Sequence, residues 1–359
     1  MEIETLVRGG ADNGGYRYLL PFAWMLPTYY ATPPGKPIPA SGAPRIELTD
    51  PDLQARAQRL INVLHWTAQT YAHISGASDA DTLKVFLAPE FLFRKGGHAI
   101  VPATDTGFGA YDHSTRYELA EALYNAINGT PLFENWLVLA GSHCSALSTE
   151  RFQGDLLNTT ILIRGRRAQR DASVPYVLVE QHYRSSLDDN AVARLAGTDQ
   201  SVAGRYALNP SQDMDHMIRW DDMTLGVELG LNHGQQALSN DLAHLSRVLG
   251  PNMPRPDLQL VASCGASIID PSCGVKDGAL ILLADGHSSA YPATIEPRFQ
   301  IGRYDAARGI ARPLPADAMT FSEVPRDDAH GVDYMQGRYA QAGCRQGVWS
   351  CKAKLPMLA

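Results

Sequence analysis

Three short segments of the sequence place residues that could do chemistry directly after an apolar, strand-like run. In each segment the run stops at small or polar residues, which is where open α/β sheets build their ligand sites. Carboxylate, hydroxyl, amide and imidazole groups gathered there can bind a polar ligand and move its protons. The segments are Leu87-Ala88-Pro89-Glu90-Phe91, Ala140-Gly141-Ser142-His143 and Gly226-Val227-Glu228-Leu229-Gly230-Leu231-Asn232-His233.

The elements that must position these segments alternate between amphipathic helices and short apolar strands. Asp50 is expected to cap a helix that begins at Pro51, and apolar residues recur at helical spacing as far as Ala68. This alternation predicts an α/β fold. Further helices are predicted over 115–127 and 235–248, strands over 16–25, 83–87, 136–140, 223–229, 258–262, 280–284 and 299–304, and a hairpin over 159–163 and 176–179.

Taken together, the segments resemble the nitrilase, or carbon–nitrogen hydrolase, superfamily from roughly residue 16 to residue 305. The resemblance implies a four-layer α-β-β-α sandwich, usually paired through a helical face into a dimer. It also implies a Glu-Lys-Cys triad that hydrolyses amides or nitriles through a thioester or thioimidate. It depends on four motifs in the family's order: the Pro-Glu pair at 89–90, Ala140-Gly141-Ser142, Asn158-Thr159-Thr160, and the Gly-x-Glu segment that ends at His233.

Matched residue by residue, the chain keeps only one member of that triad. Glu90 matches the general base, Gln181 stands where the lysine is expected, and Gly230 stands where the nucleophilic cysteine is expected. Asn232 replaces the aspartate that often follows. Thiol attack supported by a lysine is therefore closed to this chain, and Gly230 is expected to open space where a side chain would stand.

Seven further residues are expected to line the same pocket: Phe91, Ser142, His143, Asn158, Asn232, His233 and Cys264. Cys264 follows the strand that would neighbour the Gly230 strand, so it could be a displaced nucleophile. Cys144 is a second candidate, with His143 as its base. The alternative for both cysteines is a buried, small apolar side chain.

A cation to replace the missing lysine could come from several positions. If the match to the family's lysine position is shifted by one or two residues around Gln181, that position falls on Glu180 or His182, and neither is a lysine. Lys95, five residues past Glu90, and Arg184, three past Gln181, could supply the charge. Each is otherwise a solvated surface residue.

Metal and cofactor binding are not expected. The run Asp213-x-Asp215-His216 resembles a set of metal ligands, but it lies in a long polar segment and is read as solvated. The loop glycines do not match a phosphate-binding motif.

Composition excludes several classes of protein. Among 359 residues, 31 are basic and 38 acidic, and this net charge of −7 gives no basic field for nucleic acid. The apolar stretch 19–26 is too short to span a membrane, and the acidic residues before it do not suit a signal peptide. We therefore expect a cytoplasmic protein whose five cysteines, Cys344 and Cys351 included, are thiols.

The expected organisation is a carbon–nitrogen hydrolase-like domain over 1–310 and a C-terminal extension over 311–359. The extension would pack on the domain or on a neighbouring subunit of a homodimer or larger homo-oligomer.

Three hypotheses for function remain. The chain binds a small amide-, nitrile- or amidine-like compound and uses Glu90 in chemistry without a thiol; it is a pseudoenzyme that binds or assembles; or it is an amidase with Cys264 or Cys144 as a relocated nucleophile.

Overall fold

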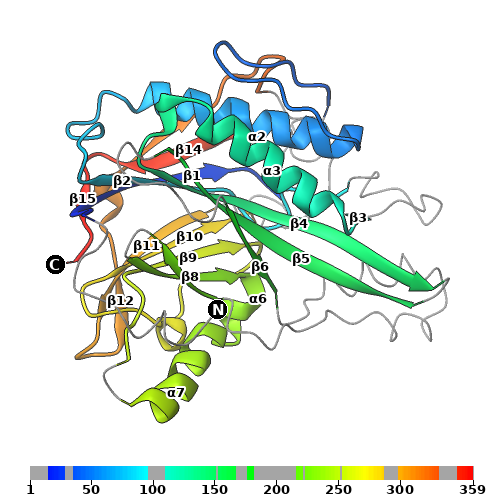
Figure 1. Cartoon of the computed structure of the whole chain (residues 1–359). Coiled ribbons are helices and arrows are strands. Elements are labelled where there is room, and N and C mark those ends of the chain that lie inside the picture. Colours follow the sequence, from blue (N-terminus) through cyan, green and yellow to red (C-terminus); the bar gives the residue numbers. More distant parts are fainter. Residues whose placement is uncertain are drawn as a thin grey trace, which may run out of the picture.

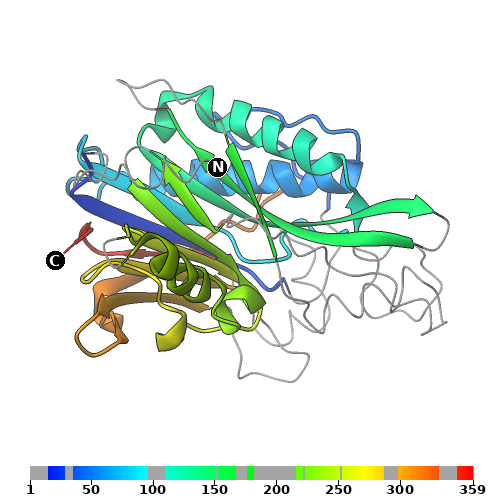
Figure 2. The same ribbon diagram turned by 60° about the horizontal axis from the view of Figure 1, so that its bottom comes forward.

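The computed structural model describes residues 15–28, 35–95, 110–150, 153–166, 176–181, 216–220, 223–250, 253–286, 298–330 and 346–358. Their two β-sheets pack face to face, and helices cover both outer faces (Figure 1). Figure 2 shows the sheets between the blue and green helices α2 and α3 on one side and the yellow-green helix α7 on the other. This α-β-β-α arrangement confirms the predicted fold class.

The first sheet, sheet A, has the strand order β13-β14-β1-β2-β4-β5-β6. Its central strands β1, β2 and β4 are parallel, and β5 and β6 return antiparallel to complete it. The bounds are β1 Tyr18–Met25, β2 Thr82–Leu87, β4 Trp136–Glu150, β5 Gln153–Arg164 and β6 Tyr176–Glu180, with the short β3, Tyr111–Asp112, beside β4. The hairpin predicted over 159–163 and 176–179 is formed by β5 and β6. Strand β4 continues past the predicted strand 136–140 and forms another hairpin with β5, which extends beyond the rest of sheet A in Figure 1.

The second sheet, sheet B, has the order β12-β11-β10-β9-β8-β7. Strands β8, β9 and β10 are parallel, and the others run antiparallel at the two edges. The bounds are β7 Met217–Trp220, β8 Met223–Leu229, β9 Leu258–Ser263, β10 Leu280–Asp285, β11 Arg298–Asp305 and β12 Ile310–Pro313.

Side chains alternate along the strands between two separate cores, as the two-residue period of a strand requires. In β1, Phe22 and Trp24 pack under the helices α2 (Pro51–Thr70) and α3 (Thr115–Asn128), while Ala23 and Met25 face sheet B. The outer face of sheet B is covered by α7 (Ala237–Leu249). The short helices are α6 Gly230–Gly234, η1 Pro131–Phe133, η2 Asp270–Ser272 and η3 Ala316–Ala318.

The described part of segment 311–359 is built into the sheets. β14 (Gly347–Cys351) pairs with β1 and lies second from one end of the sheet A order, between β1 and β13 (Met319–Glu323). β15 (Leu355–Pro356) also pairs with β1. The boundary predicted at residue 310 falls at the first residue of β12. Sequence analysis did not predict β14. The signal it missed is the short apolar run around Val348, which is typical of a buried strand.

None of the helices in the described ranges combines the length and the apolar character needed to cross a membrane.

Candidate functional site

The candidate site lies where the carboxyl ends of the parallel strands of both sheets meet. Glu90 follows β2, Gly230 follows β8 and Cys264 follows β9. Two backbone hydrogen bonds join the sheets at this end: Glu90 N donates to Ser263 O (3.3 Å) and Thr28 N donates to Gly286 O (2.8 Å). The two halves of the sandwich thus bring together residues that are far apart in sequence.

Glu90 is the centre of a buried chain of hydrogen bonds and is only 2% exposed. The amide nitrogen Nδ2 of Asn158 donates to Glu90 Oε1 (2.9 Å) and to Gln181 Oε1 (2.6 Å). The backbone N–H of Cys264 donates to Glu90 Oε2 (2.9 Å). Four of the residues expected at the site, Glu90, Asn158, Gln181 and Cys264, are therefore in one cluster.

Gly230 lies against the carboxylate of Glu90, and this corrects one expectation. A Cβ built on Gly230 would overlap Glu90 Oε2 and would lie only 2.9 Å from Glu90 Cδ. The space that the missing side chain was expected to leave open is filled by the Glu90 carboxylate. The absence of a side chain at 230 is what allows the carboxylate to approach so closely.

The loop that carries Glu90 is held by its neighbours in β4. Phe91 has a φ of 63°, a left-handed conformation that is costly for a bulky residue. Its N–H donates to Ser142 Oγ (2.8 Å). Gly141 has a φ of +77°, and a Cβ there would lie 2.5 Å from Pro89 O. Ser142 and Gly141 therefore serve to fix the position of Glu90.

His143 is not brought to the cluster. Neighbouring strand residues point to opposite faces, and the ring of His143 lies under α3, with Nε2 3.1 Å from Thr115 Oγ1 and with Tyr111 stacked on it. Burial, and the positive charge of Arg116 nearby, lower the pKa of His143 to about 3, so the ring is neutral. Cys144 points to the other face, with Sγ 3.9 Å from Asn158 Oδ1, so His143 cannot serve as its base.

His233 belongs to a second buried network, on the outer face of sheet B. Its Nδ1 lies 2.7 Å from Glu228 Oε2, and Gln259 Nε2 donates to the same oxygen (2.7 Å). The N–H of Leu238 in α7 donates to Glu228 Oε1 (3.0 Å). Because Ile269 N donates to His233 Nε2 (3.3 Å), Nδ1 carries the proton. Glu228 and His233 therefore hold the turn from β8 into α6 and α7, where the Gly230 backbone sits.

Asn232 lies in α6, on the side of the turn that faces β6. It is buried, and its Nδ2 donates to Glu180 O (3.4 Å). Glu180 itself turns outward and forms an ion pair with Arg116. Asn232 thus ties the Gly230 turn to the strand that carries Gln181.

Of the two candidate nucleophilic thiols, Cys264 is poorly suited to the role. Cys264 is half-buried, and its removal from water together with the charges of Glu90 and Asp285 raises the thiol pKa well above its ordinary value. Cys144 is buried in a small cluster with Phe91, and Cys264 packs against this cluster. Since the thiolate is the reactive form, this environment works against attack by Cys264.

Cys264 is accordingly expected to react with iodoacetamide at pH 7.5 at least about tenfold more slowly than a small-molecule thiol such as glutathione, because little thiolate is present. Alkylation followed by peptide mass spectrometry measures the rate, and Cys264→Ser identifies the modified position. Alkylation as fast as that of glutathione would contradict the raised pKa.

The cations proposed to replace the lysine are differently placed. Lys95 forms an ion pair with Asp50 (2.8 Å), the N-cap of α2. The other candidate cation, Arg184, lies outside the described residues.

Of the run that resembles metal ligands, Asp213 and Asp215 also lie outside the described residues, and His216 is buried, with Nε2 3.5 Å from Asp241 Oδ2. Cys344 lies outside the described residues as well.

Two residues of this region were missed by sequence reasoning. Asp285 closes β10 and accepts hydrogen bonds from Gly265 N (2.6 Å) and from Ser263 Oγ (3.3 Å). Its signal was an acid directly after an apolar strand, the same signal that identified Glu90. Arg94 is buried, packs over the ring of Phe91, and acts to lower the Cys264 pKa, so a cation lies within electrostatic reach of the cluster.

Comparison with known proteins gives matches among solved structures alone. No family model and no curated protein matches the chain. Nitrilase-superfamily structures do match, among them Nit3 from Saccharomyces cerevisiae, at 8% identity over 97% of this chain and 93% of that one, with a TM-score of 0.42. A mutant amidase from Nesterenkonia sp. AN1, with the acetamide moiety of fluoroacetamide on its active-site cysteine, matches at 12% identity over 97% and 94%, with a TM-score of 0.44.

A carbon–nitrogen hydrolase from Helicobacter pylori G27 matches at 6% identity over 83% of this chain and 85% of that one, with a TM-score of 0.41. These low identities and TM-scores indicate only distant similarity. The chemistry named for these proteins is a property of those proteins.

Proposed function

We propose that the chain binds a small amide-, nitrile- or amidine-like compound at Glu90 and Gln181, and acts on it with Glu90 as acid and base and without a cysteine acyl-enzyme. The motifs around Glu90, Ser142, Asn158 and Gly230 support the class of compound through their resemblance to carbon–nitrogen hydrolases. Gly230 supports the absence of the covalent step, because it offers no nucleophile.

One observation carries the proposal. Asn158 holds the Glu90 carboxylate and the Gln181 carboxamide side by side, and Gln181 Nε2 has no hydrogen-bond partner within the described part of the chain although the residue is 1% exposed. An acceptor beside an unused donor complements a primary amide, whose N–H groups donate and whose carbonyl accepts. Buried polar atoms are rarely left without a partner, so Gln181 Nε2 is suited to a ligand oxygen.

The reaction would be the addition of water to the amide carbon. Glu90 would take a proton from the attacking water, and Gln181 Nε2 would hold the oxygen that becomes negative. The C–N bond then breaks, the nitrogen receives the proton from Glu90, and the products are a carboxylic acid and ammonia. A neutral amide stabilises an oxyanion less well than a lysine does, and the loss of one such donor costs about 10²–10³ in rate.

A second candidate is a binding protein without turnover. It is favoured by the state of Glu90, since both carboxylate oxygens already accept hydrogen bonds and one of them fills the nucleophile's position.

The two candidates separate in one set of measurements. The wild-type protein is expected to release ammonia from a panel of primary amides and nitriles. The rate of release is expected to fall about 100-fold or more in Glu90→Gln. It is expected to persist in the double variant Cys144→Ala, Cys264→Ala. A cysteine adduct, or loss of activity in the double variant, would instead support a relocated thiol. Binding of an amide that depends on Glu90 but yields no ammonia would establish the second candidate, and neither binding nor release would reject both.

A homodimer or larger homo-oligomer is proposed on the resemblance alone, and light scattering of the purified protein tests its assembly.

A further inference from the structure

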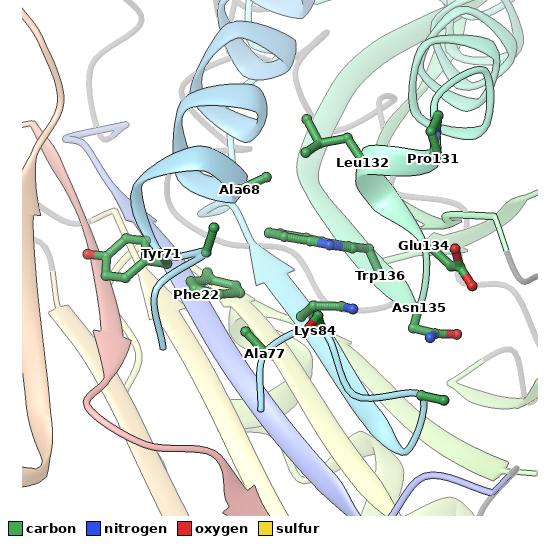
Figure 3. A pocket seen from close by; sticks show the side chains of 13 residues that line it. Phe22, Ala68, Tyr71, Ala77, Lys84, Pro131, Leu132, Glu134, Asn135 and Trp136 are labelled. Atoms are coloured by element: carbon green, nitrogen blue, oxygen red, sulfur yellow. The ribbon is translucent and has the colours of Figure 1, made fainter. Parts of the chain in front are cut away.

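A separate cavity lies at the opposite end of β2 from Glu90. Its volume is about 310 Å³, at the lower end of the range for ligand pockets. It opens between the last turn of α2 and η1, and Figure 3 shows Tyr71 and Ala68 on one side and Pro131 and Leu132 on the other. None of the residues of the Glu90 cluster lines it.

The cavity has an aromatic wall. The rings of Phe22 and Trp136 stack with centroids 5.1 Å apart, and Tyr71 packs on Phe22 at 5.3 Å. The Tyr71 hydroxyl donates to Val348 O (2.6 Å), so this residue offers its ring to the cavity. Such a surface suits a planar or apolar body.

Lys84 lines the cavity beside this aromatic wall. Its neighbours Leu83 and Val85 face sheet B, so Lys84 points to the helix side of sheet A, and in Figure 3 its amine lies among Trp136, Glu134 and Asn135. The residue is 8% exposed, and its amine has neither a hydrogen bond nor an ion pair with any residue in the described ranges. The indole N–H of Trp136 likewise has no acceptor among them. Burial of an ammonium without a partner is costly, which favours an anionic ligand.

The charges around Lys84 are few. Burial lowers the pKa of Lys84 to about 8, against the opposing effects of Glu134 and Asp79. Asp79 is engaged by Lys354 (2.6 Å), and Tyr71, the other titratable group of the wall, has its pKa raised by burial. The amine is therefore still protonated at neutral pH.

We propose that this cavity binds a small carboxylate with a planar or apolar body. The carboxylate pairs with the Lys84 ammonium and accepts from the Trp136 indole N–H, while the body lies against Phe22 and Tyr71.

The test uses 3-phenylpropionate and its neutral analogue 3-phenyl-1-propanol, measured by titration calorimetry on the full chain. Wild type is expected to bind the carboxylate about tenfold or more tightly than the alcohol, because a charged hydrogen bond contributes that much. Lys84→Met, which keeps the length and the apolar stem, is expected to lose this preference. Glu134→Gln keeps Lys84 and removes a repelling charge, so at pH 6, where the amine stays protonated in both proteins, it is expected to bind the carboxylate a few-fold more tightly.

The pH dependence gives a second readout. Affinity for the carboxylate is expected to fall as the pH rises above about 8, since the neutral amine cannot pair with it; bound ligand raises the Lys84 pKa and moves the fall upward. Lys84→Met is expected to show no such fall. Absence of binding at millimolar 3-phenylpropionate, equal binding by Lys84→Met, or affinity unchanged between pH 7 and 10 would each overturn the proposal.

Discussion

Replacing Glu228 by alanine is expected to lower the free energy of unfolding by about 3–5 kcal/mol, because the buried donors that share its carboxylate lose their acceptor. The change removes the acceptor of Leu238 N and of Gln259 Nε2, and leaves the His233 imidazole facing a cavity. Each buried donor left without an acceptor costs about 1–3 kcal/mol. Urea unfolding measures the effect through the midpoint at an unchanged slope.

Two further variants make this measurement specific. Glu228→Gln keeps the shape and one acceptor oxygen, so it is expected to cost about half as much. Glu121→Ala, an exposed glutamate of α3, is expected to change stability by less than about 0.5 kcal/mol. A loss of less than about 1 kcal/mol in Glu228→Ala would show that the Glu228–His233–Gln259 network is not formed in solution.

The elements of the fold follow closely from local sequence patterns where the pattern is long. The helix predicted from Pro51 begins there, because Asp50 accepts from Asp52 N and Leu53 N and the apolar residues keep helical spacing. The strand predicted over 223–229 has those bounds. The place of β14 beside β1 could not be predicted, since pairing between segments more than 300 residues apart leaves no periodicity in either one.

Part of the membership of the candidate site could be predicted from the sequence, but its geometry could not. Strand ends identified Glu90, Gly230 and Cys264, because parallel strands bring their carboxyl ends to one edge. Which face a residue takes depends on register, and the bulge at Gly141 turns Ser142 toward the Phe91 N–H and His143 toward α3. A single-residue irregularity of this kind reverses the side of every residue after it.

A substitution at Gly230 tests the filled nucleophile position. Gly230→Ala is expected to lower the free energy of unfolding by about 3 kcal/mol, because the new methyl group overlaps the Glu90 carboxylate and overpacking of a filled site costs about 1–3 kcal/mol or more. The φ of +20° at Gly230 adds to the strain.

The same alanine is expected to be much better tolerated once the carboxylate is removed. In the Glu90→Ala background the methyl group meets empty space, so Gly230→Ala should cost less than about 1 kcal/mol, leaving a coupling of about 2 kcal/mol between the two positions. Additive effects in this cycle would mean that the carboxylate does not occupy the position. Strong coupling would also predict that Gly230→Cys alone does not create a reactive thiol, because the Glu90 carboxylate stands where the Cβ of that cysteine would have to be.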